Sequence, residues 1–222
     1  MNKTLIFQDW GLIDYQQAWK RQEMLFEKII AEKKAGKQTD NYLIFCEHPH
    51  VYTLGKHGDQ NNMLLNSNEL HKANATFVHT NRGGDITYHG PGQIVGYPIL
   101  NLENFSLGLK QYVFNIETVI IELLALYGVF STQLAGATGV WLDAQNAKAR
   151  KICAVGVRSS HFVTMHGFAL NVNTDLTYFN HINPCGFIDK SVTSLQKELG
   201  QTIVMQEVKN NLKDIFENKI FC

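Results

Sequence analysis

The sequence predicts an α+β fold built on a β-sheet. Several short apolar runs are typical of strands, and most of them follow one another closely enough to pair as hairpins. Long segments with helical periodicity interrupt these runs. No internal repeat, low-complexity stretch or linker divides the 222 residues, so we expect a single domain covering residues 1–222.

Composition excludes several classes of protein. Hydrophobic residues make up 45% of the chain and charged residues 18%, which is enough apolar material for a sizeable core. The formal net charge is +0, which argues against a nucleic-acid binder with a broad basic face and against a polybasic membrane anchor. No apolar run approaches the ~20 residues of a membrane span, and residues 1–9 look like neither a signal peptide nor a transit peptide. We therefore expect no nucleic-acid partner and no membrane partner.

The four cysteines are Cys46, Cys153, Cys185 and Cys222. They lie far apart and form no CxxC pair, which disfavours a disulfide framework and a zinc site. A reducing cytoplasm is the predicted location. Cys46 and Cys153 lie in apolar strand-like runs and are expected to be small core residues, whereas Cys222 is expected to be exposed.

The first half of the chain reads as one helix followed by strands. Asp14 is a predicted helix cap. The stripe behind it follows helical spacing and consists of Tyr15, Ala18, Trp19, Gln22, Leu25, Phe26, Ile29 and Ile30. Residues 33–41 are a predicted polar loop. Strands are predicted at residues 42–46, 51–55, 76–79 and 94–99, with a short helix starting at Ser67. Pro98 predicts a sheet edge at the end of the last strand. A metal site at His48-Pro49-His50 is less favoured than a turn, because no third ligand is near.

The second half begins with a long helix. Apolar residues at helical spacing run from Leu109 to Tyr127, and Gly128 ends the helix. Its later half is apolar nearly all round, which predicts packing against a sheet. Strands are then predicted at 139–142, 151–157 and 167–172, a turn at 183–186, and a helix from Val204 to Phe221.

A glycine-bounded stretch is the candidate wall of a binding site. It reads Arg82-Gly83-Gly84-Asp85-Ile86-Thr87-Tyr88-His89-Gly90-Pro91-Gly92-Gln93. The glycines allow a positive φ or a close approach of the backbone to a ligand. Polar side chains capable of hydrogen bonding stand between them. A hairpin loop with incidental polar residues is the alternative, but this density of polar groups favours a site.

Two residues are candidates for chemistry. Cys185 lies in Pro184-Cys185-Gly186, a tight turn in which its sulfur is reachable, and its alternative is an idle loop cysteine. Lys151 begins an apolar stretch, where desolvation lowers the pKa of a lysine towards the range of a base. Its alternative is a solvated charge. His89 and His166 each precede a glycine, and each fits either a general base or a hydrogen-bonded turn histidine.

These segments resemble the motifs of the lipoyl(octanoyl) transferases, a family of the biotin and lipoate protein ligase superfamily. The resemblance is carried by residues 82–93, Lys151-Ile152-Cys153-Ala154-Val155-Gly156, His166-Gly167-Phe168-Ala169-Leu170-Asn171 and Asn183-Pro184-Cys185-Gly186. The upstream run Val51-Tyr52-Thr53-Leu54-Gly55 also fits. These motifs run in family order over residues 42–190. The resemblance implies a mixed sheet flanked by helices.

The resemblance also implies an activity and a set of site residues. The family moves an octanoyl group from acyl carrier protein to a lysine of a lipoyl domain, through a thioester on a cysteine and with no ATP, metal or other cofactor. Its catalytic pair falls on Cys185 and Lys151. His166 is a candidate supporting residue. The acceptors implied are the lipoyl domains of 2-oxoacid dehydrogenases and the glycine cleavage H protein. The family's acyl-binding backbone falls on Arg82, Gly83, Gly84, Asp85, Ile86, Thr87, Tyr88, His89, Ala154, Val155, Gly156, Gly167, Phe168 and Ala169.

Other readings stay open at this point. An ATP-dependent lipoate or biotin ligase shares the fold but needs no nucleophilic cysteine. A cysteine-dependent amidotransferase moving the acyl group between lipoyl domains differs only in its donor, and a non-catalytic acyl-binding module would need neither Cys185 nor Lys151. A basic cluster of Lys148, Arg150, Lys151 and Arg158 is a candidate docking site for an acidic acyl carrier protein. Solvated surface charges are the alternative.

Overall fold

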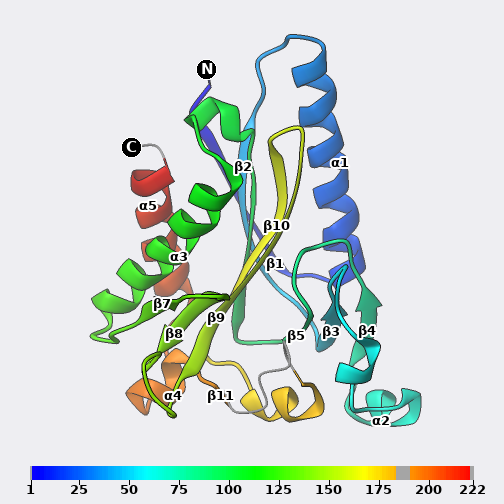
Figure 1. Ribbon diagram of the computed structural model, residues 1–222, viewed down its shortest axis with the longest axis vertical. Helices are drawn as coiled ribbons and strands as arrows, with labels where there is room; N and C mark the ends of the chain where they lie inside the picture. Colours follow the sequence, from blue (N-terminus) through cyan, green and yellow to red (C-terminus); the bar gives the residue numbers. More distant parts are fainter. Residues whose placement is uncertain (1, 184–190, 221–222) are drawn as a thin grey trace.

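The computed structural model describes residues 2–183 and 191–220. Two β-sheets and their flanking helices form a layered molecule (Figure 1). The larger sheet has the order β1-β2-β6-β10-β9-β8-β7, with β11 also pairing with β9, and the smaller has the order β4-β3-β5. The larger sheet contains β1 (Leu5–Leu12), β2 (Asn41–Glu47), β6 (Gln93–Ile99), β7 (Thr132–Leu134), β8 (Ala137–Leu142), β9 (Arg150–Ser160), β10 (Val163–Asn171) and β11 (Ser191–Val192). The smaller contains β3 (Val51–Leu54), β4 (Thr76–His79) and β5 (Ile86–His89).

The larger sheet is mixed, as the resemblance implied. β1 runs parallel to β2, and β11 runs parallel to β9, whereas the other neighbours are antiparallel. The strand β1 was not expected from the sequence. Its apolar run Leu5-Ile6-Phe7 is short, and an edge strand paired on one side only leaves a weak alternation.

Helices cover both faces of this sheet (Figure 1). Two long helices, α3 (Leu109–Leu126) and α5 (Met205–Ile220), pack on one face around a buried apolar cluster, and α1 (Tyr15–Lys34) covers part of the other. The short helices are α2 (Ser67–Lys72), α4 (Leu195–Leu199), η1 (Gln60–Asn62), η2 (Leu102–Phe105) and η3 (Leu176–His181). The expected packing of the long second helix against the sheet is confirmed.

The cap of α1 forms as predicted. The Asp14 carboxylate accepts the N–H of Gln17 at 3.0 Å, which satisfies one of the open donors of the first turn. Gln22 is the one polar residue in the predicted apolar stripe of α1. Its side-chain oxygen accepts the N–H of His166 at 3.0 Å. The helix continues to Lys34, slightly further than the loop expected from residue 33.

The prediction of a sheet edge at Pro98 is wrong. The strand β6 lies between β2 and β10, and Pro98 pairs with Leu43 on β2. The ladder with β10 extends only as far as Gly96, so the missing N–H of Pro98 falls where no ladder bond is required. The carbonyl of Pro98 accepts hydrogen bonds from the hydroxyls of Thr164 and Tyr112, at 2.9 and 3.1 Å.

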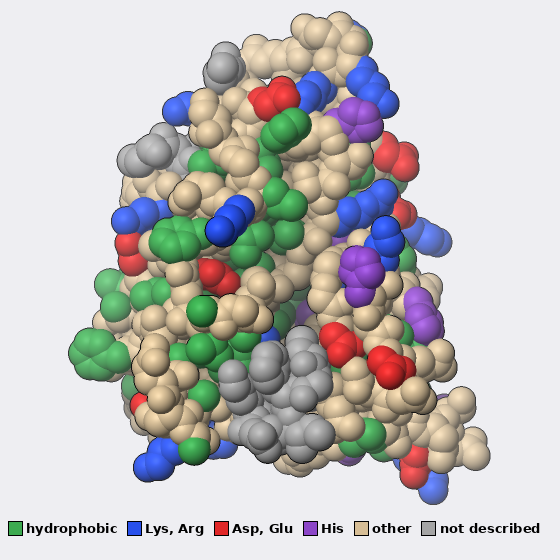
Figure 2. Space-filling model, viewed as in Figure 1, with side chains coloured by type: hydrophobic (Ala, Val, Ile, Leu, Met, Phe, Trp, Pro, Cys, Tyr) green, Lys and Arg blue, Asp and Glu red, His purple; other side chains and the backbone are tan. Residues whose placement is uncertain are grey.

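The surface carries apolar and charged side chains in different places. Hydrophobic side chains gather over α3 and β7 on the face shown in Figure 2, and Phe114, Leu126 and Phe130 are among the exposed ones. Side chains of both charge signs are distributed over the same view (Figure 2). In residues 2–183 and 191–220, no helix is both long and apolar enough to cross a membrane.

Candidate functional site

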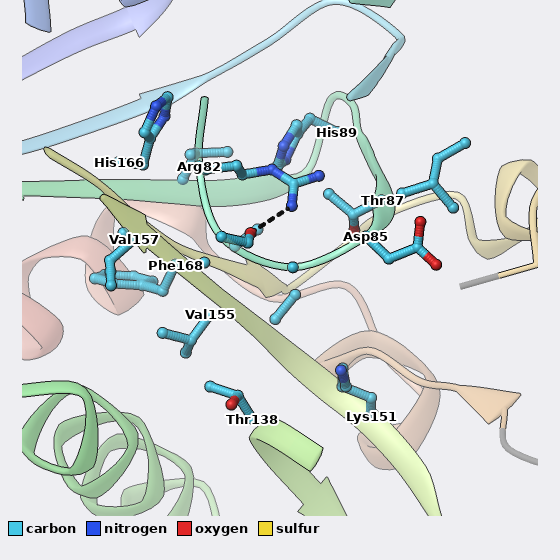
Figure 3. A pocket seen from close by; sticks show the side chains of 18 of the residues that line it. Arg82, Asp85, Thr87, His89, Thr138, Lys151, Val155, Val157, His166 and Phe168 are labelled. Carbon is cyan, nitrogen blue, oxygen red and sulfur yellow. Dashed lines mark hydrogen bonds between the residues drawn. The ribbon is translucent and has the colours of Figure 1, made fainter. Parts of the chain in front are cut away.

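A cavity of about 550 Å³ lies where the smaller sheet and the glycine-bounded stretch meet β9 and β10 (Figure 3). This size is typical of small-molecule sites. Most of the residues expected at the site line it. They are Arg82, Gly83, Gly84, Asp85, Ile86, Thr87, His89, Lys151, Ala154, Val155, Gly156, His166, Gly167, Phe168 and Ala169.

Arg82 fixes the glycine-bounded stretch against the smaller sheet. Its Nη2 donates to the carbonyl of Thr53 at 2.6 Å and to the Thr53 hydroxyl at 2.9 Å. Its Nη1 donates to the carbonyl of Gly83 at 3.0 Å (Figure 3). Because Arg82 is only 7% exposed, these charge-assisted bonds compensate for the loss of its solvation. The guanidinium therefore holds the loop from inside.

The same loop lies directly on β9. The N–H of Gly83 donates to the carbonyl of Val157 at 2.9 Å. A β-carbon at Gly156 would lie 3.0 Å from the Gly83 carbonyl, and one at Gly55 would lie 2.1 Å from the Gly84 carbonyl. Glycine is needed at these contacts because the backbones approach too closely for a side chain.

Strand β5 divides its side chains between two environments. Thr87 and His89 face the cavity, whereas the Tyr88 side chain lies on the other side of the strand, as the alternation of a strand requires. The Tyr88 hydroxyl is 2.7 Å from His50 Nδ1, and its ring stacks on Tyr178 with centroids 4.9 Å apart. The Tyr88 side chain therefore packs in a separate aromatic cluster away from the cavity, and the acyl-binding role expected of its backbone stays a prediction.

His89 is a buried, hydrogen-bonded histidine. Its Nδ1 lies 2.8 Å from the Gln93 side-chain oxygen, and its Nε2 lies 3.3 Å from the Thr53 hydroxyl. The Gln93 amide in turn donates to the Asn171 side-chain oxygen at 2.9 Å. Burial lowers the pKa of His89 to about 3, so the ring is neutral at neutral pH. Of the two readings of His89, the structure favours a hydrogen-bonded structural histidine.

His166 lies at the opposite end of the cavity from Lys151 (Figure 3). Its φ of 59° is unusual for a residue other than glycine. Its Nε2 lies 2.7 Å from the Asn81 side-chain oxygen. Burial and the charges of Arg82 and Arg158 lower the pKa of His166 to about 3. The burial and the Asn81 contact favour a hydrogen-bonded structural histidine, and a supporting role in the reaction stays a prediction.

Lys151 extends from β9 into the cavity. Its ammonium lies 4.7 Å from the centre of the Trp141 ring, a cation–π distance. In Figure 3 the amine points towards the space between Thr138 and the loop carrying Asp85. The residue is half-buried rather than solvated, which favours the site reading over a surface charge.

Cys185 lies outside the described residues, so the turn expected around it stays a prediction. The described residues on either side lie against the site. The N–H of Asn183 donates to the carbonyl of Asn62 at 2.9 Å. On the same side, Phe179 lines the cavity. On the other side, β11 pairs with β9 so that Val192 is opposite Lys151, and Ser191 and Val192 line the cavity. Cys222 also lies outside the described residues, whereas Cys46 and Cys153 are buried free thiols, as expected.

The candidate metal pair is used in hydrogen bonding. His48 contacts the Ile13 carbonyl and the Tyr97 hydroxyl, both at 2.7 Å, and His50 contacts the Tyr88 hydroxyl. Within the described part of the chain, no group of three or more histidine, cysteine, aspartate or glutamate residues is arranged to hold a metal. The preference for a turn at residues 48–50 agrees with this arrangement.

The basic cluster expected as a docking site is divided in the structure. Arg150 forms an ion pair with Glu198 at 2.6 Å and a second with Asp143. Arg158 lies over the ring of Phe26, near the other end of β9. Lys148 remains exposed. A docking role therefore stays a prediction for Lys148, while Arg150 is already neutralised by two carboxylates.

Sequence reasoning missed two residues beside Lys151. Trp141 provides the ring under its ammonium, and Glu117 on α3 directs its carboxylate to the same corner. Glu117 is 8% exposed, so its carboxylate is buried in the packing of α3. Because the same helix also carries Glu122, its sequence alone does not single out Glu117.

Comparison with known proteins places the chain in a family. Residues 14–217 match the model of the lipoyl protein ligase A/B catalytic domain. An octanoyltransferase of Bacteroides fragilis is 61% identical over 204 residues, covering 92% of each chain. This chain belongs to the lipoyl(octanoyl) transferase family. An octanoyltransferase of Flavobacterium psychrophilum is 52% identical over 229 residues, covering 100% of this chain and 99% of the other octanoyltransferase.

Solved structures confirm the fold expected for a lipoyl(octanoyl) transferase. A lipoate-protein ligase A bound with ATP superposes with a TM-score of 0.71 at 13% identity, covering 99% of this chain and 86% of the ligase. A biotin protein ligase from Aquifex aeolicus gives a TM-score of 0.54 at 14% identity, covering 99% of this chain and 71% of the other. At such low identity the likeness concerns the fold alone.

Proposed function

We propose that this protein is an octanoyltransferase that moves the acyl group from octanoyl-acyl carrier protein to a lysine of a lipoyl domain. The observation that carries the proposal is the cavity, which has Lys151 at one end and an apolar slot behind it. Small residues, Ala154, Gly156, Gly167 and Ala169, form the floor of the slot and leave room for methylene groups. Relatives named octanoyltransferase at 52–61% identity support the same reaction.

The slot suits an apolar chain of this length. Burial of one methylene contributes about 0.8 kcal/mol, so the six methylenes of an octanoyl group contribute roughly 5 kcal/mol. Lys151 and Val157 are six residues apart on β9, which at about 3.3 Å per residue is roughly 20 Å. That length accommodates the acyl chain together with the end of the arm that delivers it.

The first half-reaction transfers the acyl group to Cys185. Lys151 takes the thiol proton of Cys185, and the thiolate attacks the acyl carbonyl carbon. The bond from that carbon to the sulfur of the carrier arm breaks, and the departing thiolate takes the proton back from Lys151. One thioester replaces another, so no nucleotide is consumed.

The second half-reaction transfers the acyl group to the acceptor. The neutral amine of the acceptor lysine attacks the thioester carbon, and Lys151 removes a proton from the attacking nitrogen. The bond from that carbon to the Cys185 sulfur then breaks. The cysteine thiolate regains a proton from Lys151. An amide replaces a thioester, which is favourable without ATP.

Backbone groups of β9 are candidates to hold the oxyanion. β8 pairs with β9 as far as Cys153, and Gly83 bonds to the carbonyl of Val157. Backbone groups of an antiparallel strand alternate between its two edges. Val155, midway between these residues, therefore directs its N–H towards the cavity edge, where it can donate to the tetrahedral intermediate.

The acceptors we propose are the lipoyl domains of 2-oxoacid dehydrogenases and the glycine cleavage H protein. We propose the cytoplasm as the location, because the buried Cys46 and Cys153 are free thiols, which suits a reducing compartment.

The substitution Lys151→Met tests the role of the lysine. It keeps the length of the side chain and removes the amine, so both half-reactions should slow by at least the ~100-fold typical of a lost general base. Lys110→Met, an exposed substitution at the start of α3, serves as the charge-matched control and should retain full activity. Single-turnover rates of Cys185 acylation and of transfer to a lipoyl domain measure the two steps. A Lys151→Met protein with the full rate of both steps would refute the role.

A further inference from the structure

Glu117 is a buried carboxylate directed at the strand next to Lys151. Its Oε1 accepts the N–H of Gly139, on β8, at 2.7 Å. Burial raises the pKa of Glu117, while the Gly139 N–H and the charge of Lys151 act in the opposite direction. Glu117 lies outside every motif by which the family was identified, so the proposed mechanism leaves it without a role.

Gly139 is also the residue that the Lys151 side chain crosses. A β-carbon at Gly139 would lie 3.3 Å from Lys151 Cε and 2.5 Å from the carbonyl of Cys153. Its φ of +125° adds a second reason for glycine. The peptide held by the Glu117 carboxylate is therefore the surface on which the stem of Lys151 lies. Trp141, two residues further along β8, supplies the ring under the ammonium.

We propose that Glu117 is a positioning residue for Lys151, which fixes the Gly139 peptide under the lysine stem and stabilises the ammonium that forms when Lys151 takes a proton. The inference rests on the proposed function, because the proton concerned comes from Cys185. Forming an ammonium and a thiolate in a partly buried cavity is costly. A carboxylate and an aromatic face beside the ammonium lower that cost.

Among the described residues, the groups that face Lys151 come from α3, β8, β11, β9 and the loop carrying Asp85. The Asp85 carboxylate lines the same cavity and accepts the Asp59 N–H at 3.2 Å and the Asn62 amide at 2.7 Å. α3 contributes Glu117, β8 contributes the Trp141 ring, and β11 contributes Ser191 and Val192, which do not titrate. On β9 itself, the Cys153 thiol stays neutral because burial raises its pKa. The neighbouring charge of Arg150 is engaged by Glu198 and Asp143. Removing the charge of Glu117 should therefore weaken the hold of Lys151 on its proton.

The test compares Glu117→Gln with Glu122→Gln. Glutamine at position 117 keeps an oxygen acceptor for the Gly139 N–H and removes only the charge. Glu122 lies on the same helix and pairs with Lys219 at 2.6 Å, away from the cavity, so it provides a matched control. The readout is the single-turnover rate of octanoyl transfer from octanoyl-acyl carrier protein to Cys185, followed by intact mass between about pH 5 and pH 10.

We expect the limb of the pH–rate profile governed by Lys151 to move to lower pH by about one unit in Glu117→Gln and to stay in place in Glu122→Gln. Trp141→Leu should move it in the same direction, and this variant carries the test if Glu117→Gln does not fold. A uniformly lower rate with an unchanged midpoint would overturn the inference and leave the proposed function intact. Absence of a Cys185 adduct in the unsubstituted protein would overturn both.

Discussion

Arg82 and Thr53 are joined by two hydrogen bonds from a single nitrogen, at 2.6 Å to the Thr53 carbonyl and 2.9 Å to its hydroxyl. They connect the glycine-bounded stretch to the strand β3, with which β5 pairs. Because the guanidinium is buried, its orientation fixes where the following glycines meet β9. The wall of the site is therefore set by a residue whose own role is mainly structural.

Replacing Arg82 by lysine should damage both stability and activity. A lysine keeps the charge but cannot bridge Thr53 and Gly83 at once. We expect a loss of about 1.5–3 kcal/mol in the free energy of unfolding and slower Cys185 acylation. Arg21→Lys, at an exposed arginine over Trp10, should change stability by less than ~0.5 kcal/mol. Denaturant unfolding of the two variants checks this, and equal stabilities would contradict it.

Adding volume to the floor of the slot should change the preferred acyl length. Ala154→Val adds two methyl groups on the cavity side of β9. The binding of the longest acyl groups should weaken the most, by about 0.8 kcal/mol for each methylene displaced from the slot. Acylation rates for hexanoyl, octanoyl and decanoyl donors measure the change, with the exposed Ala125→Val on α3 as the control. If hexanoyl and decanoyl donors slowed equally, the acyl chain would lie elsewhere.

The buried histidines should make the fold sensitive to acid. Burial lowers the pKa of His48 to about 4 and those of His89 and His166 to about 3. An unfolded histidine has a pKa near 6.5, so between about pH 6.5 and pH 3 the unfolded chain binds more protons than the native one, and stability falls as the pH falls. Each of these three histidines should lower the free energy of unfolding by about 2 kcal/mol between pH 7 and pH 5.

Urea unfolding at a series of pH values measures this dependence. His89→Gln should reduce the loss of stability between about pH 7 and pH 5 by the share of one histidine. His71→Gln, at an exposed position in α2, should leave it unchanged. A pH dependence identical in the unsubstituted protein and His89→Gln would show that His89 is not buried as a neutral ring.

Local signals were sufficient for much of the fold. The Asp14 cap, the spacing behind it and the glycine after Tyr127 predicted the two long helices close to their observed ends. Pro98 misled because whether a strand lies at an edge depends on its partners, which are distant in sequence. The strand β1 was missed because its apolar run is short and its partner β2 comes some thirty residues later.

The site was predictable where it is made of contiguous motifs. The glycine-bounded stretch, Lys151 and the segment from His166 to Ala169 all line one cavity. The motif did not reveal that the Tyr88 side chain faces away from the cavity, because membership of a motif does not determine which face of a strand a side chain takes. Glu117 could not be assigned from sequence because only the packing of α3 against β8 brings its carboxylate beside Lys151.

The most direct test of the central claim is mass spectrometry of the protein after incubation with octanoyl-acyl carrier protein and no ATP. The account predicts one octanoyl adduct, mapped to Cys185 by peptide analysis, absent from Cys185→Ser, and discharged when a lipoyl domain is added. An adduct on another residue, or acyl transfer that needs ATP and persists in Cys185→Ser, would contradict it.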